Sequence, residues 1–436
     1  MKKRMVTALA MGSLALITIG ADATSEQYWP QWRGPHATGV SKTADPPVEW
    51  SEPRNIRWKI EIPGRGSGTP VIWGDKLFVL TAVPAGADLA ASHQARGGVR
   101  PAVPHKFQVL AIDRETGKIV WERTARESVP HEGSHQQFGT YSSSSAFTDG
   151  ERVYAFFDSF GLYAYDMNGK LLWAKDLGDK RMRMEFGEGQ TPVLHGNTIV
   201  VQWDHQGPSF ITALDKTTGK ELWRTERQEI DSWGTPLVVE HNGKAQVIAS
   251  AMNRVTSYDL ATGQVVWQGP GLTMNPIPST VHENGMVFAV SGFRGNKLLA
   301  IQLDEAKGDL TATRAVKWEL NADTPYVPSP LLYDGIIYLL KSNSGILSAF
   351  DAKTGKPHYQ LQRLADVPNV FASPVGAKGR VYIPGQQGAT IVLKAGPSYE
   401  VITTNTLDDG FDASPALVDN EIYLRGAKYL YSIGTK

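Results

Sequence analysis

Six tryptophans recur along the chain, and this repeat constrains the fold more than any other feature. The intervals between them are 63, 52, 50, 44 and 51 residues, for Trp58, Trp121, Trp173, Trp223, Trp267 and Trp318. A loosely kept period of this length is typical of repeat architectures, in which each unit is one supersecondary element that packs on its neighbours. The chain is therefore expected to fold as a series of similar units.

A turn motif of Asp, three residues and Gly stands near most of these tryptophans. It occurs as the pairs Asp113/Gly117, Asp215/Gly219, Asp259/Gly263 and Asp351/Gly355, as Asp304/Gly308 further from its Trp, and one residue shorter as Asp166/Gly169. An Asp side chain that bonds its own turn, followed by Gly at positive φ, is the chemistry of a tight hairpin. Each motif predicts a turn between two strands.

A small residue beside Pro opens an alternating apolar segment after each tryptophan. Eight such openings occur: Thr69-Pro70, Thr191-Pro192, Thr235-Pro236, Ser329-Pro330, Ser373-Pro374 and Ser414-Pro415, with Ser145-Ala146 and Pro278-Ser279 in the equivalent places. Each segment continues through a turn into another β-rich run, so that every unit has four strands. The sequence predicts an all-β, eight-bladed β-propeller of four-stranded antiparallel blades.

The last unit ends without an outer strand that carries a Trp. Residues 55–60, around Trp58, can supply this strand. Pairing the first strand with the last blade removes an open sheet edge, so we expect the ring to be closed by the N-terminal strand. We expect the repeated Trp, Asp and Gly residues to be packing residues rather than ligand contacts.

The N-terminus has the pattern of a secretory signal. A basic start (1–5) precedes an apolar run (6–20) and the cleavage pattern Ala21-Asp22-Ala23. We expect a signal peptide over 1–23, an N-terminal extension over 24–54 and the propeller over 55–436, in a periplasmic or secreted protein. A membrane anchor is the alternative, but the apolar run is short for a bilayer, and no later apolar run is long enough for a transmembrane segment of the mature chain.

Composition narrows the classes of partner. Lys plus Arg equal Asp plus Glu at 44 each, so no global charge draws the protein to nucleic acid. The chain has no Cys, which excludes structural disulfides, lipid attachment through an N-terminal Cys and covalent haem.

From Tyr28 onward the chain resembles secreted bacterial proteins of the pyrroloquinoline-quinone (PQQ) repeat family. The stretches that carry the resemblance are Trp-Pro-Gln-Trp-Arg-Gly-Pro (29–35), Thr-Asp-Gly-Glu-Arg-Val-Tyr (148–154) and the segment 324–335. The resemblance implies the propeller fold, and it leaves activity open because one fold hosts many functions. A second resemblance, to the propeller subunit that assists outer-membrane protein assembly, implies a scaffold that binds proteins.

PQQ dehydrogenases of this family resemble one another in a calcium site of Glu, Asn and Asp under the quinone, and often in a pair of adjacent cysteines. This chain departs from that pattern, since it has neither cysteines nor a Cys-x-x-Cys-His haem segment. The resemblance therefore implies PQQ with Ca²⁺ only as an alternative cofactor.

Propeller topology divides the loops between two faces. The first and third turns of each unit, including the Asp-Gly turns, lie on one face, and the second loop and the inter-blade connection lie on the other. The long irregular segments all belong to this second face, here called the irregular face: 81–106, 124–141, 175–190, 203–208 and 293–296. Binding residues on a rigid scaffold are expected in such loops. The segment 81–106 reads equally well as a mobile lid or as disorder.

Histidines and acids in these loops are candidates for a metal or ligand site. His131-Glu-Gly-Ser-His135 fits the zinc-protease pattern H-E-x-x-H by letter, but Pro130 and Gly133 favour a loop over the helix that such a site needs. Blade order predicts that His131, His135, Glu185, Asp204 and His205 lie close enough to share a ligand. Of these, His131, His135, Asp204 and His205 are the candidates for binding a divalent metal. The alternative is that Arg183, Glu185, Asp204 and His205 form a hydrogen-bond network that holds the loops.

A second set of residues flanks the first strands and is predicted to line the mouth of the axis. With Arg183 and Glu185, the ligand-binding candidates are Arg65, Trp233, Asn275, Arg294, Tyr326 and Asp412. Arg, Asn, Asp and aromatic side chains together suit a polar small molecule or a sugar.

Three functions follow, and the absence of a complete catalytic set in the sequence favours the first. It is a non-enzymatic exported propeller that binds a polar small molecule, a carbohydrate or a protein partner on its irregular face. The second is a PQQ- and Ca²⁺-dependent dehydrogenase of alcohols or sugars. The third is a metal-assisted enzyme that uses the His131 region.

Overall fold

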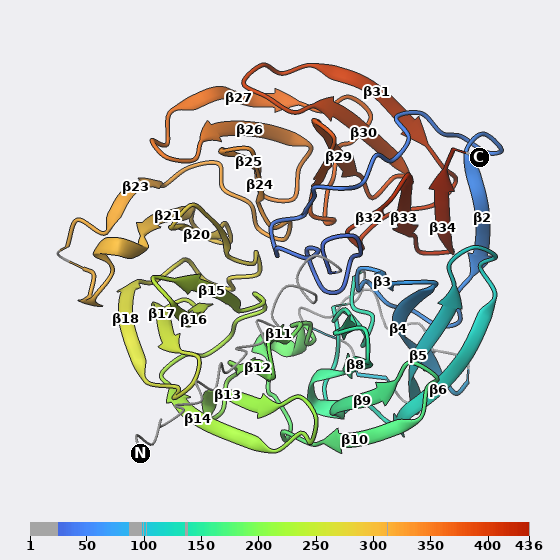
Figure 1. Ribbon diagram of the computed structural model, residues 1–436, viewed down its shortest axis with the longest axis horizontal. Helices are drawn as coiled ribbons and strands as arrows, with labels where there is room; N and C mark the ends of the chain where they lie inside the picture. Colours follow the sequence, from blue (N-terminus) through green and yellow to red (C-terminus); the bar gives the residue numbers. More distant parts are fainter. Residues whose placement is uncertain are drawn as a thin grey trace, which may run out of the picture.

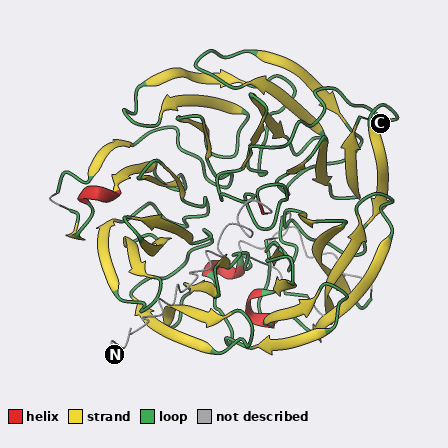
Figure 2. Ribbon diagram, in the orientation of Figure 1, coloured by secondary structure: helices red, strands yellow, loops and turns green. Residues whose placement is uncertain are grey.

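Eight sheets, each built on four antiparallel strands, are arranged around a central axis in the computed structural model of the chain (Figure 1). It describes residues 25–86, 98, 100–101, 103–135, 138–311 and 313–435. The expected signal peptide and the middle of the 81–106 segment lie outside the described residues. Within the described ranges the helices are three short 3₁₀ turns (Figure 2): η1 (Asp158–Phe160), η2 (Arg183–Glu185) and η3 (Leu303–Glu305). None of them has the length and hydropathy of a membrane span.

Blades 1 to 4 are formed by consecutive strands, from the innermost to the outermost. These are β3 (Val71–Trp73), β4 (Lys76–Pro84), β5 (His105–Asp113) and β6 (Ile119–Ser128); β7 (Phe147–Thr148), β8 (Arg152–Phe156), β9 (Leu162–Asp166) and β10 (Leu171–Lys175); β11 (Val193–His195), β12 (Thr198–Trp203), β13 (Ser209–Asp215) and β14 (Glu221–Arg227); and β15 (Leu237–His241), β16 (Lys244–Ser250), β17 (Arg254–Asp259) and β18 (Val265–Pro270).

Blades 5 to 8 follow the same plan with two exceptions: β22 (Gly308–Asp309), which precedes the outer strand of blade 5 in the chain, belongs to blade 4, and the outer strand of blade 8 comes from the N-terminal part of the chain. They are β19 (Val281–Glu283), β20 (Met286–Ser291), β21 (Lys297–Gln302) and β23 (Val316–Leu320); β24 (Leu331–Tyr333), β25 (Ile336–Leu340), β26 (Ile346–Asp351) and β27 (Pro357–Arg363); β28 (Val375–Ala377), β29 (Arg380–Pro384), β30 (Ala389–Lys394) and β31 (Val401–Thr406); and β32 (Ala416–Val418), β33 (Glu421–Arg425), β34 (Tyr429–Gly434) and β2 (Ile56–Glu61).

The ring is closed as the sequence predicts. Strand β2 pairs antiparallel with β34, with Trp58 opposite Ser432, and the strand is observed over 56–61 instead of 55–60. In Figure 1 the blue β2 lies beside the red β34. Both long edges of the C-terminal strand are therefore paired, one with β33 and one with β2.

The repeated tryptophans join neighbouring blades. In five units the indole N–H donates to a backbone carbonyl in the Asp-Gly turn of the next blade: Trp58 to Arg114, Trp121 to Met167, Trp173 to Lys216, Trp223 to Leu260 and Trp318 to Ala352, at 2.8–3.1 Å. The ring lies over the turn glycine, so that a Cβ added to Gly219 would stand 2.7 Å from the Trp173 ring. Gly219 also has φ +69°, which only Gly adopts without strain. The prediction of a packing role is confirmed for these residues.

Trp267 and the Asp304/Gly308 motif depart from this plan, and the prediction of a tight hairpin there is wrong. Gly308 belongs to β22 (Gly308–Asp309), which pairs in parallel with β18 as a fifth strand of blade 4. Trp267 is buried and donates to Oε1 of Gln246 in its own blade (3.2 Å). In the other units the Asp-Gly turn of the next blade packs on the outer strand. In blade 4 the longer connection between β21 and β23 covers the outer strand β18 instead.

The opening residues link the blades close to the axis. Between six pairs of neighbouring blades, the backbone N–H of one opening residue donates to the side-chain hydroxyl of the opening residue in the next blade, at 2.8–3.1 Å. Two series of residues are linked in this way, Thr69 to Ser145 to Thr191, and Thr235 to Ser279 to Ser329 to Ser373 to Ser414. Each such bond satisfies a buried backbone donor that no ladder reaches. This explains why a Ser or Thr recurs at the position.

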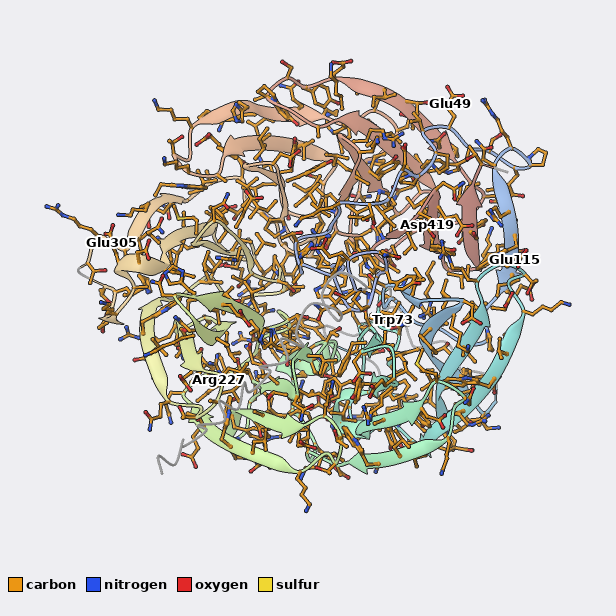
Figure 3. The ribbon with its side chains drawn as sticks, in the orientation of Figure 1. Glu49, Trp73, Glu115, Arg227, Glu305 and Asp419 are labelled. Atoms are coloured by element: carbon orange, nitrogen blue, oxygen red, sulfur yellow. The ribbon has the colours of Figure 1, made fainter. Side chains whose placement is uncertain are left out.

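The segment that precedes β2 packs across the axis on the side of the first and third turns. Trp29 is fully buried and exchanges backbone hydrogen bonds with Ile72. The buried guanidinium of Arg33 donates to the carbonyls of Pro330 (2.7 Å) and Pro374 (2.6 Å), and burial lowers its pKa to about 9. Strand β1 (Val40–Ser41) then pairs in parallel with β28. Side chains fill the space between the sheets and this segment (Figure 3).

Candidate functional site

A cavity of about 480 Å³ lies on the axis at the irregular face. All eight blades contribute a hydroxyl residue to it, at or just before their openings: Ser67, Ser143, Thr191, Thr235, Ser279, Ser329, Ser373 and Ser414. Trp32, from the N-terminal segment, also lines the cavity and donates its indole N–H to Oγ of Ser279 (3.0 Å). Because that segment packs from the opposite face, Trp32 forms the floor.

Aromatic side chains make up much of the wall. They are Trp32, Phe138, Tyr141, Phe157, Phe160, Phe186, Trp233, Phe293, Tyr326 and Phe371. Two pairs hold each other in place: the ring centroids of Phe138 and Phe371 lie 4.4 Å apart, and those of Phe293 and Tyr326 stack at 4.7 Å. A cavity of this size with apolar walls and a few polar groups is typical of small-molecule sites.

Four of the eight ligand-binding candidates line this cavity: Trp233, Asn275, Tyr326 and Asp412. Asn275 is the most unusual of them, because it has φ +51°, is only 3% exposed, and its Oδ1 has no hydrogen-bond partner. Burial raises the pKa of Tyr326, and a hydrogen bond with Asn275 opposes this shift. A buried acceptor without a partner is costly unless a ligand or water supplies a donor.

The other four candidates are placed elsewhere. Arg65 lines a small adjoining cavity of about 60 Å³, which it shares with Asp412. Arg183 forms an ion pair with Asp231 (3.2 Å), and Glu185 accepts a bidentate contact from Arg100. The guanidinium of Arg294 lies 5.6 Å from the ring centroid of Phe293.

His131 and His135 lie on the cavity wall, in a loop without helix, as the sequence predicts for this segment. Nε2 of His131 lies 2.8 Å from the carbonyl oxygen of Lys180. The ring of His135 stands between Phe138 and Phe186, and burial lowers its pKa. The segments around 131–135, 180–188 and 205–206 meet on one face, as predicted, through backbone bonds from 135 to 186 (3.1 Å) and from 206 to 181 (2.8 Å).

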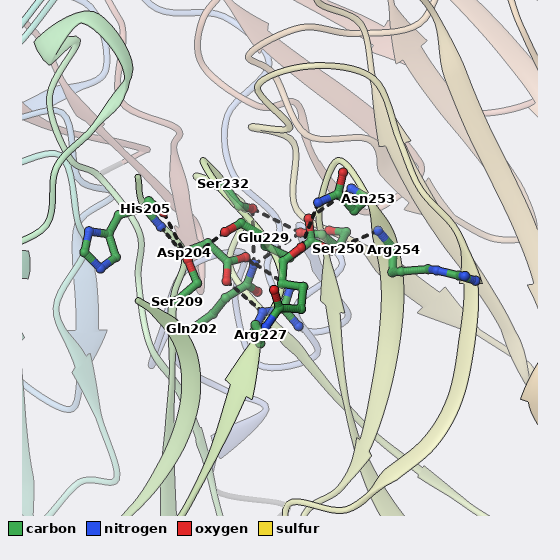
Figure 4. Close-up of polar contacts among 12 residues, drawn as sticks. Gln202, Asp204, His205, Ser209, Arg227, Glu229, Ser232, Ser250, Asn253 and Arg254 are labelled. Atoms are coloured by element: carbon green, nitrogen blue, oxygen red, sulfur yellow. Dashed lines mark hydrogen bonds and ion pairs between the residues drawn. The ribbon is translucent and has the colours of Figure 1, made fainter. Parts of the chain in front are cut away.

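Asp204 and His205 belong to a separate, buried network (Figure 4). Both carboxylate oxygens of Asp204 accept from the Arg227 guanidinium, at 2.7 and 3.0 Å. Burial alone would lower the pKa of Arg227, but the charge of Asp204 raises it. Nδ1 of His205 accepts from the backbone N–H of Arg181 (3.0 Å). Asp204 and His205 thus bond to Arg227 and Arg181, whereas Arg183 and Glu185, the other members of the predicted network, pair with Asp231 and Arg100. Across the described part of the chain no group of three or more His, Asp or Glu side chains is arranged to hold a metal ion.

The wall of the axial cavity also contains a buried cluster of charged residues that the sequence did not predict. Nζ of Lys180 lies 2.8 Å from Asp158, and both side chains are buried. Glu188 accepts from the backbone N–H and the hydroxyl of Ser159, and its Oε1 lies 3.7 Å from Nε2 of His131. Burial, and then the charge of Asp158, raise the pKa of Glu188 to about 8. Glu188 lies in the irregular 175–190 connection, but its hydrogen-bond partner Ser159 belongs to η1, in a different loop, so the sequence alone does not pair the two residues.

Comparison with known proteins agrees with the geometry of the fold. A family profile described as "Outer membrane protein assembly factor BamB" matches residues 48–208, 105–357 and 207–433. A tetrathionate hydrolase of Acidithiobacillus ferrooxidans is 27% identical over 244 residues, which cover 52% of this chain and 44% of that protein. The match thus spans less than half of this curated relative.

Solved structures show the same fold at low sequence identity. BamB from Moraxella catarrhalis superposes with a TM-score of 0.57 at 15% identity, covering 87% of this chain and 99% of that one. Quinohemoprotein alcohol dehydrogenase from Comamonas testosteroni gives 0.62 at 11% identity, covering 95% and 82%. With its repeats, blades and closure, the chain belongs to the PQQ-repeat β-propeller family that includes the assembly factor BamB.

Proposed function

We propose that this protein is an exported binding protein that holds a polar small molecule, such as a carbohydrate, in the axial cavity of its irregular face. The observation that carries the proposal is Asn275, whose buried Oδ1 lacks a partner on the wall of a cavity that is rich in aromatic rings and hydroxyls. Aromatic faces cover the C–H surface of a ring-shaped ligand, while hydroxyl and amide groups pair with its polar edge. Trp32 closes the bottom of the cavity, so the ligand enters from the irregular face.

Tryptophan fluorescence tests this function, because Trp32 and Trp233 both line the cavity. The full mature protein is titrated with a panel of sugars, polyols and small cyclic alcohols, and hits are repeated by calorimetry. A binder at 100 times its dissociation constant raises the free energy of unfolding by about 2.7 kcal/mol. Trp233→Ala and Asn275→Ala should abolish the response, whereas Trp73→Ala, on the opposite face, should leave it. A panel without a single hit, or hits that survive Trp233→Ala, would refute the cavity as the site.

The PQQ alternative is less well supported by the residues present. PQQ carries several carboxylates, but the charged side chains of the described lining are acidic, Glu132, Asp158, Glu188 and Asp412, beside two histidines, with no Lys or Arg among them. A cofactor anion would meet like charge in a desolvated site. Nor do the acids of the described residues form a three-ligand group for Ca²⁺. The described lining does not fit this cofactor, and we derive no reaction from it.

A protein partner on the same face is the second candidate. Val129 and Met184, both in inter-blade connections of this face, are 49% and 51% exposed although they are apolar. The family profile is named after an outer-membrane assembly factor, so binding of a polypeptide at this face is a function that relatives suggest for this chain. Retention of a partner from extracts by the parent protein, and its loss in a Val129→Lys, Met184→Lys variant, would support it. Equal retention by both proteins would exclude this patch.

A further inference from the structure

We propose that the axial cavity selects a small cation, an amine or quaternary ammonium group on an organic body, over its neutral and anionic analogues. This inference rests on the proposed binding function and names the chemical class of ligand. Three observations carry it: the sign of the charges on the wall, the aromatic faces beside them, and the kind of polar group left without a partner.

The charges nearest the cavity are negative in excess. Asp158 and Glu188 share one buried ammonium group, that of Lys180, whose Nζ bonds Asp158 at 2.8 Å. With both acids ionised the trio carries one net negative charge, and Ser159 contributes only neutral donors to Glu188. In the free protein a proton on Glu188 relieves this charge, as its raised pKa indicates. A cationic ligand can take the place of that proton.

A second acid faces the cavity from blade 8. Oδ1 of Asp412 accepts from Nε2 of Gln386 (2.6 Å), which is neutral. Burial raises the pKa of Asp412, and Arg65 is the cation whose charge opposes this shift. Asp412 lines both the axial and the adjoining cavity, whereas Arg65 lines the adjoining one, so the acid of this pair is the member that reaches the axial wall.

Aromatic faces complete a cage for a cation. A quaternary ammonium group is attracted to ring faces, and the attraction is strongest where water is excluded. Trp32 on the floor and Trp233 on the wall offer the largest rings, and Trp233 is fixed by its bond to the carbonyl of Gly187 (2.9 Å). Asn275 adds a buried acceptor without a partner, Oδ1, and acceptors pair with the N–H or O–H donors of an amine or amino alcohol.

Three probes of nearly the same shape isolate the charge. Choline, 3,3-dimethyl-1-butanol and 3,3-dimethylbutanoate are titrated into the full mature protein at moderate salt, with tryptophan fluorescence and calorimetry as readouts. A desolvated cation–π contact together with the acidic wall predicts choline to bind at least about 10-fold more tightly than the neutral alcohol, and the carboxylate to bind more weakly than either.

Variants connect the preference to the named acids. Glu188→Gln and Asp412→Asn should each reduce the ratio of choline to alcohol affinity by about threefold or more, because each removes a negative charge and keeps the size of the side chain. Glu115→Gln removes a carboxylate from an exposed turn on the opposite face and should leave the ratio unchanged; Figure 3 labels this residue at the rim. Circular dichroism spectra and cooperative unfolding like those of the parent protein establish that the variants are folded.

The outcomes separate this inference from the proposed function. Equal or tighter binding of the alcohol or the carboxylate overturns the cation preference, and so does a preference that survives both substitutions. No binding of choline at millimolar concentration also overturns it. If in any of these cases a neutral compound from the broader panel still binds and Trp233→Ala abolishes that binding, the proposed function stands without the cation preference.

Discussion

The buried ion pair of Asp204 and Arg227 gives the sharpest test of how the irregular face is held together. Asp204→Ala leaves the guanidinium of Arg227 buried, with the hydroxyl of Tyr258 as its remaining side-chain acceptor. Breaking one side of such a pair costs about 3–5 kcal/mol, because the remaining charge keeps its desolvation penalty. At about 2.1 cal/mol/K per residue, roughly 400 folded residues have an unfolding entropy of about 0.85 kcal/mol/K, so the midpoint should fall by about 4–6 °C.

Thermal unfolding followed by circular dichroism measures this shift. An exposed pair of the same blade, Arg224 with Glu221, is the matched control, and Glu221→Ala should change the midpoint by about 1 °C or less. A double variant, Asp204→Leu with Arg227→Met, should recover part of the loss because it removes both charges. The reasoning is refuted if Asp204→Ala melts with the parent protein. It is also refuted if a chelator lowers the parent's midpoint as much as the substitution does, since Asp204 would then act through a metal.

Three further predictions follow from contacts described above. Trp58→Ala should destabilise the ring by about 3–5 kcal/mol in urea unfolding, because it empties the space over Gly117; an unchanged urea midpoint would show that closure does not depend on this contact. Glu188 has a higher pKa folded (about 8) than unfolded, so the folded state binds its proton more tightly; its contribution to stability is complete below about pH 4.5 and is lost as the pH rises through 8. Melting curves across that range should show a steeper decline for the parent than for Glu188→Gln, and parallel curves would contradict the shift. His205→Ala should cost about 1 kcal/mol by freeing the N–H of Arg181, without loss of metal by elemental analysis; a loss of bound metal would restore the metal-site hypothesis.

The propeller was predictable because its determinants are local and repeated. An Asp-Gly turn specifies its own hairpin through bonds such as that from the backbone N–H of Thr218 to Asp215 (2.8 Å), wherever it occurs in the chain. The same motif failed at Asp304 because its surroundings differ: Asp304 lies within η3, β22 follows it, and its carboxylate pairs with His241 (2.9 Å). Turn chemistry alone cannot reveal an insertion that packs on the preceding blade.

The site was only partly predictable, because loop order gives the face but not the direction of a side chain. Trp233 and Asn275 follow from their place beside the first strands. Asp204 lies on the predicted face, yet its carboxylate is directed at Arg227, which stands two strands away in the same blade. Lys180 and Glu188 belong to one connection and their partner Asp158 to another, and the sequence has no local signal for such a pairing.

Ring closure by β2 also determines when the protein can acquire its fold. Trp58 is made early and Ser432, its partner in the ladder, almost last. At synthesis rates of about 5–20 residues per second, the first strand waits on the order of 20–75 s for the blade that receives it. During that time β2 has no partner strand, and blade 1 has no blade 8 against which to pack. The pairing of β2 with β34 closes a loop of nearly the whole chain, and the entropic cost of that closure falls in a single late step. The completed ring therefore forms only after almost the entire polypeptide is available.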